Sequence, residues 1–290
     1  MPDFLKKIMP RKLKLSIIIV NYHSKNLLLG CLRSIFWQEN KFSFEVIVVD
    51  NDEQKTIEKP LKRQFPCVKY IRSPGNIGFG AGNNLGTEFS RGEFLFFLNP
   101  DTIVLPGAIN KLVAFMETRT KKKVGIVAPV LLDENKKPYP LQGTAELSPL
   151  TAVVSFSFLN KYFPNNPVSY HYWLKNWDKT TTKEVVTVPG TALLIRRKIF
   201  EKISGFDQKF FLYFEEIDLC KRVKESSWGI FINPSAKVIH LWGKCTPGSS
   251  EIKEIFKKSR FYYFRKHFGI TSASLVELFL RSAEWLAQLF

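Results

Sequence analysis

The sequence lacks the features of a membrane-spanning, secreted or disulfide-bonded protein. A helix needs about 20 apolar residues to cross a bilayer, and no apolar run in the sequence is that long. The apolar stretch at 15–20 is not followed by the small-residue cleavage site of a signal peptide. Cysteine is rare and shows no CxxC spacing, its four positions being Cys31, Cys67, Cys220 and Cys245. We therefore expect reduced thiols, neither a zinc site nor a disulfide framework, and a cytoplasmic location.

Acidic residues are scarce relative to basic ones: 26 Asp and Glu stand against 43 Lys and Arg, which gives a formal net charge of +17. This excess suits a polyanionic partner, which could be a nucleic acid, an anionic membrane face or a phosphorylated substrate. The basic residues are scattered without a nucleic-acid-binding motif, so we expect no nucleic-acid partner. With 290 residues and 45% hydrophobic content, the chain can form one large α/β domain or two small ones.

The first hundred residues alternate strand and helix signals. Short apolar runs predict buried strands, and apolar residues at helical spacing predict the helices between them. In chain order these elements are strand 15–20, helix 24–37, strand 44–49, strand 68–71, helix 80–90 and strand 94–98. Such alternation favours an α/β fold with a mostly parallel sheet and helical crossovers, the usual architecture of a nucleotide site.

The alternation loosens in the second half of the chain. Its predicted elements are helix 107–116, strand 124–128, strand 191–195 and helix 215–226. Between them lies a stretch rich in Pro, Asn and aromatic residues, 133–183, which we expect to be an irregular binding surface or lid.

The last twenty residues, 271–290, predict a largely apolar helix. Its polar side chains recur every three to four positions and form one narrow stripe, consisting of Glu277, Arg281, Glu284 and Gln288. The apolar remainder must be buried in something. It could pack on its own domain, form a homodimer with a second subunit, or lie in a membrane interface helped by nearby basic residues.

Two predicted strands of the first half end in a carboxylate. Asp50 and Asn51 end one strand, and Asn99 and Asp101 end another, with Pro100 between them. The carboxyl ends of parallel strands meet at one edge, so both could face a nucleoside diphosphate with a divalent metal. Either aspartate could instead be a turn residue that only closes its strand.

A glycine-rich segment and a histidine are weaker signals. The segment from Asn76 to Asn84 follows a predicted strand and opens a predicted helix, so it is either a phosphate-binding loop or a plain turn. His240 ends an apolar run and is either structural or, beside Asp101, a second metal ligand.

Three carboxylates gather at the start of the helix predicted over 215–226. Glu215, Glu216 and Asp218 follow an aromatic run. One or two of them could serve only to cap the helix and stabilise its dipole. A carboxylate in partly apolar surroundings has a raised pKa, which suits a general base acting on a hydroxyl.

Taken in order, these segments resemble the inverting family 2 glycosyltransferases of the GT-A fold, and within them the bacterial rhamnosyltransferase-like branch. The likeness covers roughly residues 14–268. It rests on the strings SIIIVNYHS, FEVIVVDND, NIGFGAGNN, FLFFLNPDT, VPGTALLIRRKIFEKISGFDQKFFLYFEEIDLCKR, VIHLWG and SRFYYFRKHFG. The resemblance implies a glycosyltransferase domain over 13–248, with a nucleotide-binding half (13–102) and an acceptor and base half (103–248), followed by a helical extension over 249–290.

The resemblance also implies roles for individual residues. Asp101 would hold Mg²⁺ or Mn²⁺ on the diphosphate as the last carboxylate of the family's DxD motif, and His240 would complete that metal site. The residues that would line the nucleotide-sugar pocket are Asn21, Tyr22, Asp50, Asn51, Asn76, Gly78, Asn84, Asn99 and Asp101.

Glu216 matches the family's catalytic base, although the usual Glu-Asp pair reads Glu215-Glu216 here, and Asp218 is a reserve candidate. The implied reaction is a single displacement, in which the base deprotonates an acceptor hydroxyl and the anomeric configuration inverts. The implied donor is dTDP-L-rhamnose or else UDP-galactofuranose or a UDP-hexose, and the acceptor is a saccharide or a lipid-linked saccharide at the inner membrane face. A catalytically silent nucleotide-binding scaffold stays open as an alternative.

Overall fold

The structure is a computed structural model, and it describes residues 13–54, 56–118, 123–241 and 250–289. Cys245 and the expected domain boundary at 248 lie outside the described residues. The strands are β1 (Leu15–Asn21), β2 (Phe44–Asp50), β3 (Lys69–Arg72), β4 (Phe94–Leu98), β5 (Thr102–Val104), β6 (Val124–Leu132), β7 (Lys183–Glu184), β8 (Ala192–Arg196) and β9 (Gly229–His240). The helices are α1 (Lys25–Phe36), α2 (Glu58–Gln64), α3 (Phe79–Glu88), α4 (Ala108–Glu117), α5 (Pro149–Ser155), α6 (Phe158–Tyr162), α7 (Pro167–Tyr172), α8 (Arg197–Lys202), α9 (Glu215–Glu225) and α10 (Ser250–Leu289).

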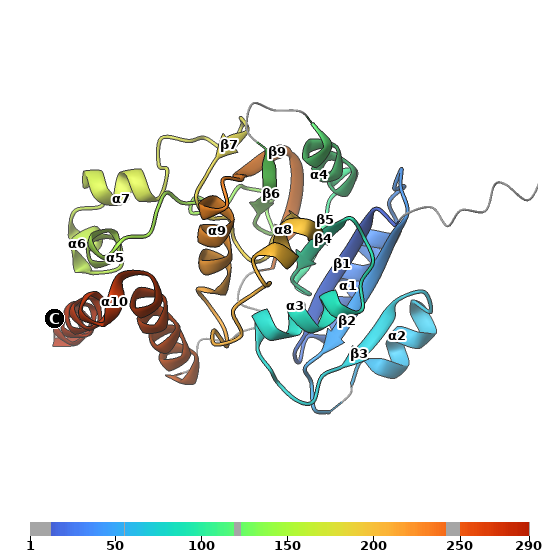
Figure 1. Cartoon of the computed structure of the whole chain (residues 1–290), viewed down its shortest axis with the longest axis horizontal. Coiled ribbons are helices and arrows are strands. Elements are labelled where there is room, and N and C mark those ends of the chain that lie inside the picture. Colours follow the sequence, from blue (N-terminus) through green and yellow to red (C-terminus); the bar gives the residue numbers. More distant parts are fainter. Residues whose placement is uncertain (1–12, 55, 119–122, 242–249, 290) are drawn as a thin grey trace, which may run out of the picture.

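One mixed sheet forms the centre of the molecule, with strand order β3-β2-β1-β4-β8-β6-β9-β5 (Figure 1). Strands β1 to β4 are parallel, as predicted, because a helix connects each of them to the next. Beyond them β8 runs antiparallel to both β4 and β6, so the second half of the sheet is mixed. The carboxyl ends of β1, β2 and β4 therefore share one edge of the sheet.

Helices cover both faces of this sheet. One face carries a core built from the apolar sides of α1, α2 and α4, and the other carries the apolar sides of α8 and α9 with Phe206. Strands β1 and β4 are buried at every position, which explains why they read as continuous apolar runs rather than as alternating ones.

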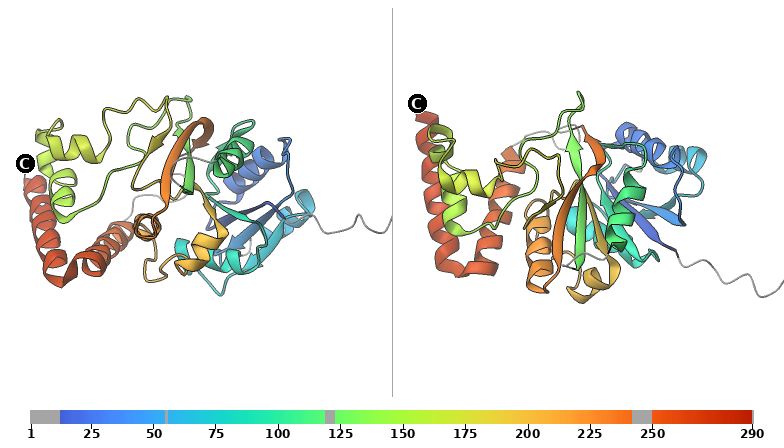
Figure 2. Two further views of the ribbon diagram at one scale, coloured as in Figure 1. Left: turned by 45° about the horizontal axis from the view of Figure 1, so that its top comes forward. Right: turned by 90° about the horizontal axis from the view of Figure 1, so that it is seen from above.

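A third, aromatic core lies at the end of the molecule opposite β3 and α2, where α5–α7 pack against α10 (Figures 1 and 2). The expectation of an irregular stretch over 133–183 is wrong here, because three short helices occupy it. Two of them begin at a capping residue followed by proline, Ser148-Pro149 and Asn166-Pro167, and each cap accepts a backbone hydrogen bond.

Helix α10 begins about twenty residues earlier than the predicted helix and bends at Gly269, whose φ is 84°. We call residues 250–268 its first arm and residues 270–289 its second arm. Glu277, which the sequence placed in a polar stripe, is only 6% exposed and accepts hydrogen bonds from Arg260 of the first arm at 2.5 and 3.1 Å. The second arm packs on its own chain through Val276 and Leu280.

Candidate active site

Asp50 ends β2, and both of its carboxylate oxygens accept hydrogen bonds. Its Oδ1 accepts from the side-chain amide of Asn21 at 2.9 Å and from the backbone N–H of Asp52 at 3.2 Å, while its Oδ2 accepts from the hydroxyl of Tyr70 at 2.9 Å. Asn21 reaches it because β1 and β2 pair in register at these two positions. Tyr22 follows with an exposed ring, and its centroid lies 4.1 Å from that of His23.

The glycine-rich segment meets the loop that leads to α9. Gly78 has φ +86°, and a Cβ there would lie 2.3 Å from the backbone oxygen of Phe211. The same oxygen accepts a hydrogen bond from the backbone N–H of Phe79 at 3.0 Å. A residue with a side chain would therefore be strained and would push this contact apart.

The asparagines around this segment hold backbone groups. The side-chain amide of Asn51 donates to the oxygen of Gly78 at 3.1 Å, and Asn76 accepts from the N–H of Gly78 at 3.2 Å. Asn84 uses both ends of its amide on the backbone of Phe206, at 2.8 and 2.9 Å. Asn84 thus fastens the loop before α9 to α3.

Asp101 and His240 meet although 139 positions separate them in the chain. Strands β5 and β9 pair antiparallel with Thr102 opposite His240, and the His240 Nε2 lies 3.5 Å from Asp101 Oδ2. Asp101 is 3% exposed, and within the described chain its Oδ1 has no hydrogen-bond partner, nor has Oδ1 of Asn99. The thiol of Cys31 lies behind this turn, 3.4 Å from the Thr102 hydroxyl.

These groups suit a hard divalent cation. Mg²⁺ and similar ions take oxygen ligands from one or two carboxylates and complete their shell with substrate phosphates and water. A buried carboxylate oxygen without a partner beside an imidazole provides such a partial site. Among the described residues no cluster of three or more His, Cys, Asp or Glu side chains forms, so a closed all-protein metal site is not present there.

Glu215 and Glu216 begin α9 directly after two strained residues. Tyr213 and Phe214 have φ of 68° and 67°, a left-handed conformation that costs a non-glycine residue about 1–3 kcal/mol. Burial raises the pKa of both glutamates, and the neighbouring Glu216 raises that of Glu215 further. The Oε2 atoms of both carboxylates are buried without a hydrogen-bond partner in the described part of the chain.

One cavity of about 460 Å³ joins these groups. Asn99, Asp101 and His240 line it together with Glu215 and Glu216. Gly190 lies in the wall beside the base candidate, and a Cβ there would lie 3.4 Å from the Glu216 Cβ. The predicted nucleotide-side residues do not line this cavity, namely Asn21, Tyr22, Asp50, Asn51, Asn76, Gly78 and Asn84.

An aromatic wall of the cavity was not predicted from the sequence. It combines residues of α7, the loop before α9 and the first arm of α10, namely Phe156, Tyr172, Trp173, Tyr213, Phe214 and Phe256. No single segment reveals these residues, because the wall forms only when α10 packs on α5 and α6, and α7 packs on α5. The sequence does signal where α5 and α7 begin, through the capping residues Ser148 and Asn166.

Asp218, the reserve candidate for the base, lies outside the cavity lining. Its side chain is fully buried among Arg222, Lys266 and His267. Burial by itself would raise the pKa of Asp218, but these partners lower it to about 2. A carboxylate so firmly held in its charged form is a poor proton acceptor.

Comparisons with known proteins agree with this arrangement. A family model described as glycosyl transferase family 2 matches residues 16–204. The chain is 25% identical over 208 residues to the N-acetylglucosaminyl-diphospho-decaprenol L-rhamnosyltransferase of Mycobacterium tuberculosis, covering 67% of this chain and 66% of that relative. It is 25% identical over 234 residues to rhamnosyltransferase WbbL of Escherichia coli, covering 77% of this chain and 82% of that relative.

Solved glycosyltransferases share the fold. A crystal structure of GalNAc-T7 with UDP, GalNAc and Mn²⁺ superposes with a TM-score of 0.60 at 14% identity, over 88% of this chain and 50% of that one. Staphylococcus aureus TarS 1-349 in complex with UDP gives 0.55 at 16% identity, over 91% of this chain and 70% of that one. The central sheet and its covering helices are thus a GT-A fold, and the chain belongs to glycosyl transferase family 2.

Proposed function

We propose that this chain transfers L-rhamnose from dTDP-L-rhamnose to a saccharide acceptor in cell-surface polysaccharide synthesis, with inversion at the anomeric carbon. One observation carries the proposal: Glu216, whose Oε2 is buried without a hydrogen-bond partner in the described part of the chain, lines the same cavity as Asp101 and His240. The names of the mycobacterial and Escherichia coli relatives support rhamnose as the sugar.

Glu216 is the general base of the proposed reaction. Burial raises its pKa, so the carboxylate gains more from taking a proton than an exposed one does. Its Oε2 takes the proton of an acceptor hydroxyl, the hydroxyl oxygen attacks the anomeric carbon, and the bond to the diphosphate breaks with its electron pair. The nucleoside diphosphate departs on the face opposite the new bond.

Asp101 and His240 would hold Mg²⁺ or Mn²⁺ in this scheme, and the amide oxygen of Asn99 lies in the same lining. A divalent cation bound there neutralises negative charge on the diphosphate. The structure of GalNAc-T7 with Mn²⁺ supports a metal in this fold. Chelation with EDTA is expected to abolish transfer, and added Mn²⁺ to restore it.

The donor is bound by the first half of the chain, with Asp50, Asn21 and Tyr22 toward the base and ribose and the segment around Gly78 toward the sugar. A UDP-sugar such as UDP-galactofuranose or a UDP-hexose is the alternative, and the UDP complex of TarS favours keeping it. Thermal stabilisation by dTDP and UDP, each with and without Mn²⁺, separates the two. A larger metal-dependent shift with UDP would replace rhamnose by the alternative.

Replacement of the base tests the enzymatic role. Glu216→Gln keeps the size of the side chain but cannot accept the proton, so we expect turnover to fall by about 10²–10⁴-fold. The assay follows dTDP release from dTDP-L-rhamnose with N-acetylglucosaminyl-diphospho-decaprenol, the acceptor in the name of the mycobacterial relative. The thermal shift with dTDP and Mn²⁺ should stay unchanged in the variant. Undiminished turnover would instead support a nucleotide-binding scaffold that is catalytically silent.

The acceptor is proposed to be lipid-linked and to be met at a membrane surface. The aromatic wall of the cavity is built by the same helices that expose large apolar side chains outward, among them Leu150 on α5 and Leu275 and Leu278 on α10. The net charge of +17 suits the anionic inner face of a cell membrane. None of the described helices is long and apolar enough to cross a bilayer. A homodimer through α10 is the competing use of the same apolar residues.

A further inference from the structure

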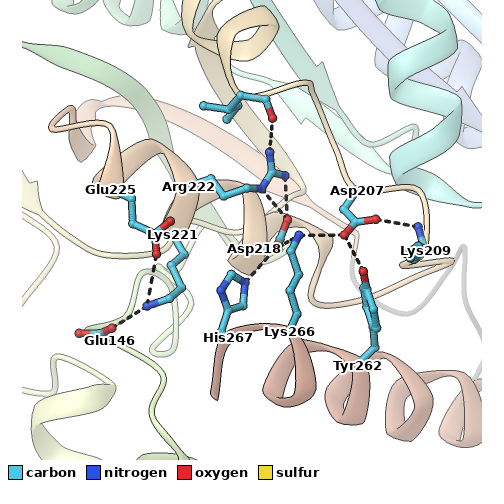
Figure 3. A network of polar contacts seen from close by, with 11 residues as sticks. Glu146, Asp207, Lys209, Asp218, Lys221, Arg222, Glu225, Tyr262, Lys266 and His267 are labelled. Atoms are coloured by element: carbon cyan, nitrogen blue, oxygen red, sulfur yellow. Dashed lines mark hydrogen bonds and ion pairs between the residues drawn. The ribbon is translucent and has the colours of Figure 1, made fainter. Parts of the chain in front are cut away.

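Asp218 is a buried carboxylate that the proposed reaction does not use. It lies in the first turn of α9, two positions after Glu216, and its side chain has no exposed surface. Its Oδ1 lies 2.6 Å from Lys266 Nζ and 2.8 Å from His267 Nε2, while its Oδ2 lies 2.8 Å from Arg222 Nε (Figure 3). Lys266 and His267 belong to the first arm of α10, so Asp218 joins that arm to α9.

The same network reaches the loop before α9. Lys266 Nζ lies 2.8 Å from Asp207 Oδ2, and the hydroxyl of Tyr262 donates to the same oxygen at 2.9 Å. Arg222 donates to the backbone oxygen of Ile203 at 2.6 Å. Figure 3 shows Tyr262, Lys266 and His267 rising from one face of α10 toward the two aspartates. The loop and the helix that it precedes are therefore anchored to one common surface.

The anchored segment includes the strained pair directly before the base. Tyr213 and Phe214 both have positive φ, and such conformations persist only where the surroundings over-determine them. The ring of Phe214 packs on Phe256 and Tyr263 of α10, at centroid distances of 5.2 and 5.7 Å. Aromatic contacts thus hold the strained pair that precedes α9, and the ion pairs of Asp218 hold the first turn of α9.

We infer that Lys266 and His267 are positioning residues, which act through Asp218 to fix the first turn of α9 so that Glu216 faces the cavity. The inference rests on the proposed function for its catalytic consequence. The metal-side residues lie elsewhere in the fold, Asp101 directly before β5 and His240 at the end of β9, whereas the network joins α9 to the first arm of α10. Loosening the network should therefore slow the chemical step and spare donor binding.

The kinetic test compares Lys266→Met, His267→Ala and His267→Gln. We expect kcat for transfer from dTDP-L-rhamnose to fall by at least about tenfold in the first two variants, with the donor KM changed by less than about twofold. His267→Gln should recover much of kcat, because the glutamine amide can still donate to Asp218. The matched control is Glu277→Gln, which breaks a buried ion pair of the same helix that does not touch α9 and should lower the melting temperature without lowering kcat.

Amide hydrogen exchange tests the positioning without an assay of turnover. Exchange at residues 213–219 should accelerate in Lys266→Met and His267→Ala and stay at the wild-type rate in Glu277→Gln. Unchanged exchange at residues 213–219, or wild-type kcat in both Lys266→Met and His267→Ala, would overturn the positioning role. Absence of transfer by the wild-type chain would overturn the proposed function instead, while the exchange result would still decide whether α10 holds this turn.

Discussion

At the scale of single residues, the sequence pointed to Asp101, His240 and Glu216, and the structure gathers these three around one cavity. The resemblance to family 2 glycosyltransferases made this possible, because its motifs mark Asp101 before β5, His240 at the end of β9 and Glu216 in the first turn of α9. The sequence could not reveal that both carboxylate oxygens of Asp50 accept hydrogen bonds within the chain, because one donor, Tyr70, lies on a third strand. Nor could it reveal the ion pairs of Asp218 with Lys266 and His267, which lie about fifty positions later in the chain.

Gly78 brings the glycine-rich segment against the backbone of Phe211 in the loop before α9. Gly78→Ala must either keep a positive φ or break the Phe79–Phe211 contact, so we expect the free energy of unfolding to fall by about 2 kcal/mol or more. Gly30→Ala is the control, because a Cβ at this position of α1 meets nothing within 4 Å and alanine favours the helix. Urea unfolding measures both variants, and equal stability of the two would contradict the strained role of Gly78.

Glu215 should destabilise the folded chain at alkaline pH. The pKa of Glu215 is raised in the folded state. Its protonated form therefore adds to the free energy of unfolding below the ordinary pKa of a glutamate, and this contribution is lost as the pH rises through the raised pKa. Glu215→Gln removes this titration. We therefore expect the variant to gain unfolding free energy over the wild type at about pH 8 and to lose that advantage near about pH 4. Denaturant titrations at both pH values check the sign, and a constant difference would refute it.

At the scale of elements, strands and helices of the first half were predictable because their apolar patterns are long and regular. The helices of 149–172 were missed because each spans fewer than two full turns and its apolar residues share no period. The second arm of α10 shows a different failure. Its helical period was right, but which face is buried depends on Arg260, a partner beyond the bend at Gly269.

The ion pair between the two arms offers a prediction about α10. Glu277→Leu alone leaves the guanidinium of Arg260 buried beside an apolar neighbour, so the free energy of unfolding should fall by about 3–5 kcal/mol. The double variant Arg260→Met/Glu277→Leu should recover most of that loss, since no unpaired charge stays buried. Chemical denaturation of the two variants is the measurement. A double variant as unstable as the single one would show that the pair contributes more than charge compensation.

At the scale of the whole molecule, the alternation of strand and helix signals predicted the class of fold but not the mixed direction of the sheet. Strand β8 reverses direction because it follows the long segment of α5–α7 and β7 rather than a helical crossover. The distribution of outward apolar residues on α5 and α10 was equally hidden, because it depends on which sides of these helices the aromatic core uses.

The proposed membrane contact gives a prediction for the intact chain. We expect it to sediment with vesicles that contain anionic lipid and not with neutral ones, and raising the salt concentration to about 1 M should weaken the binding. Leu275→Glu/Leu278→Glu should reduce binding further, because both side chains are more than half exposed. Light scattering in the absence of vesicles measures whether the chain forms a dimer. If the chain forms a dimer and these substitutions dissociate it, the apolar residues serve self-association instead.

The pairing of β4 with β8 has a consequence for biosynthesis. Phe94–Leu98 is buried at all five positions, yet the strand that covers its free side is synthesised almost a hundred residues later. While the intervening chain emerges from the ribosome, this phenylalanine-rich edge stays unpaired and can recruit other nascent chains. The order of the strands therefore leaves this edge open to aggregation until β8 has been synthesised.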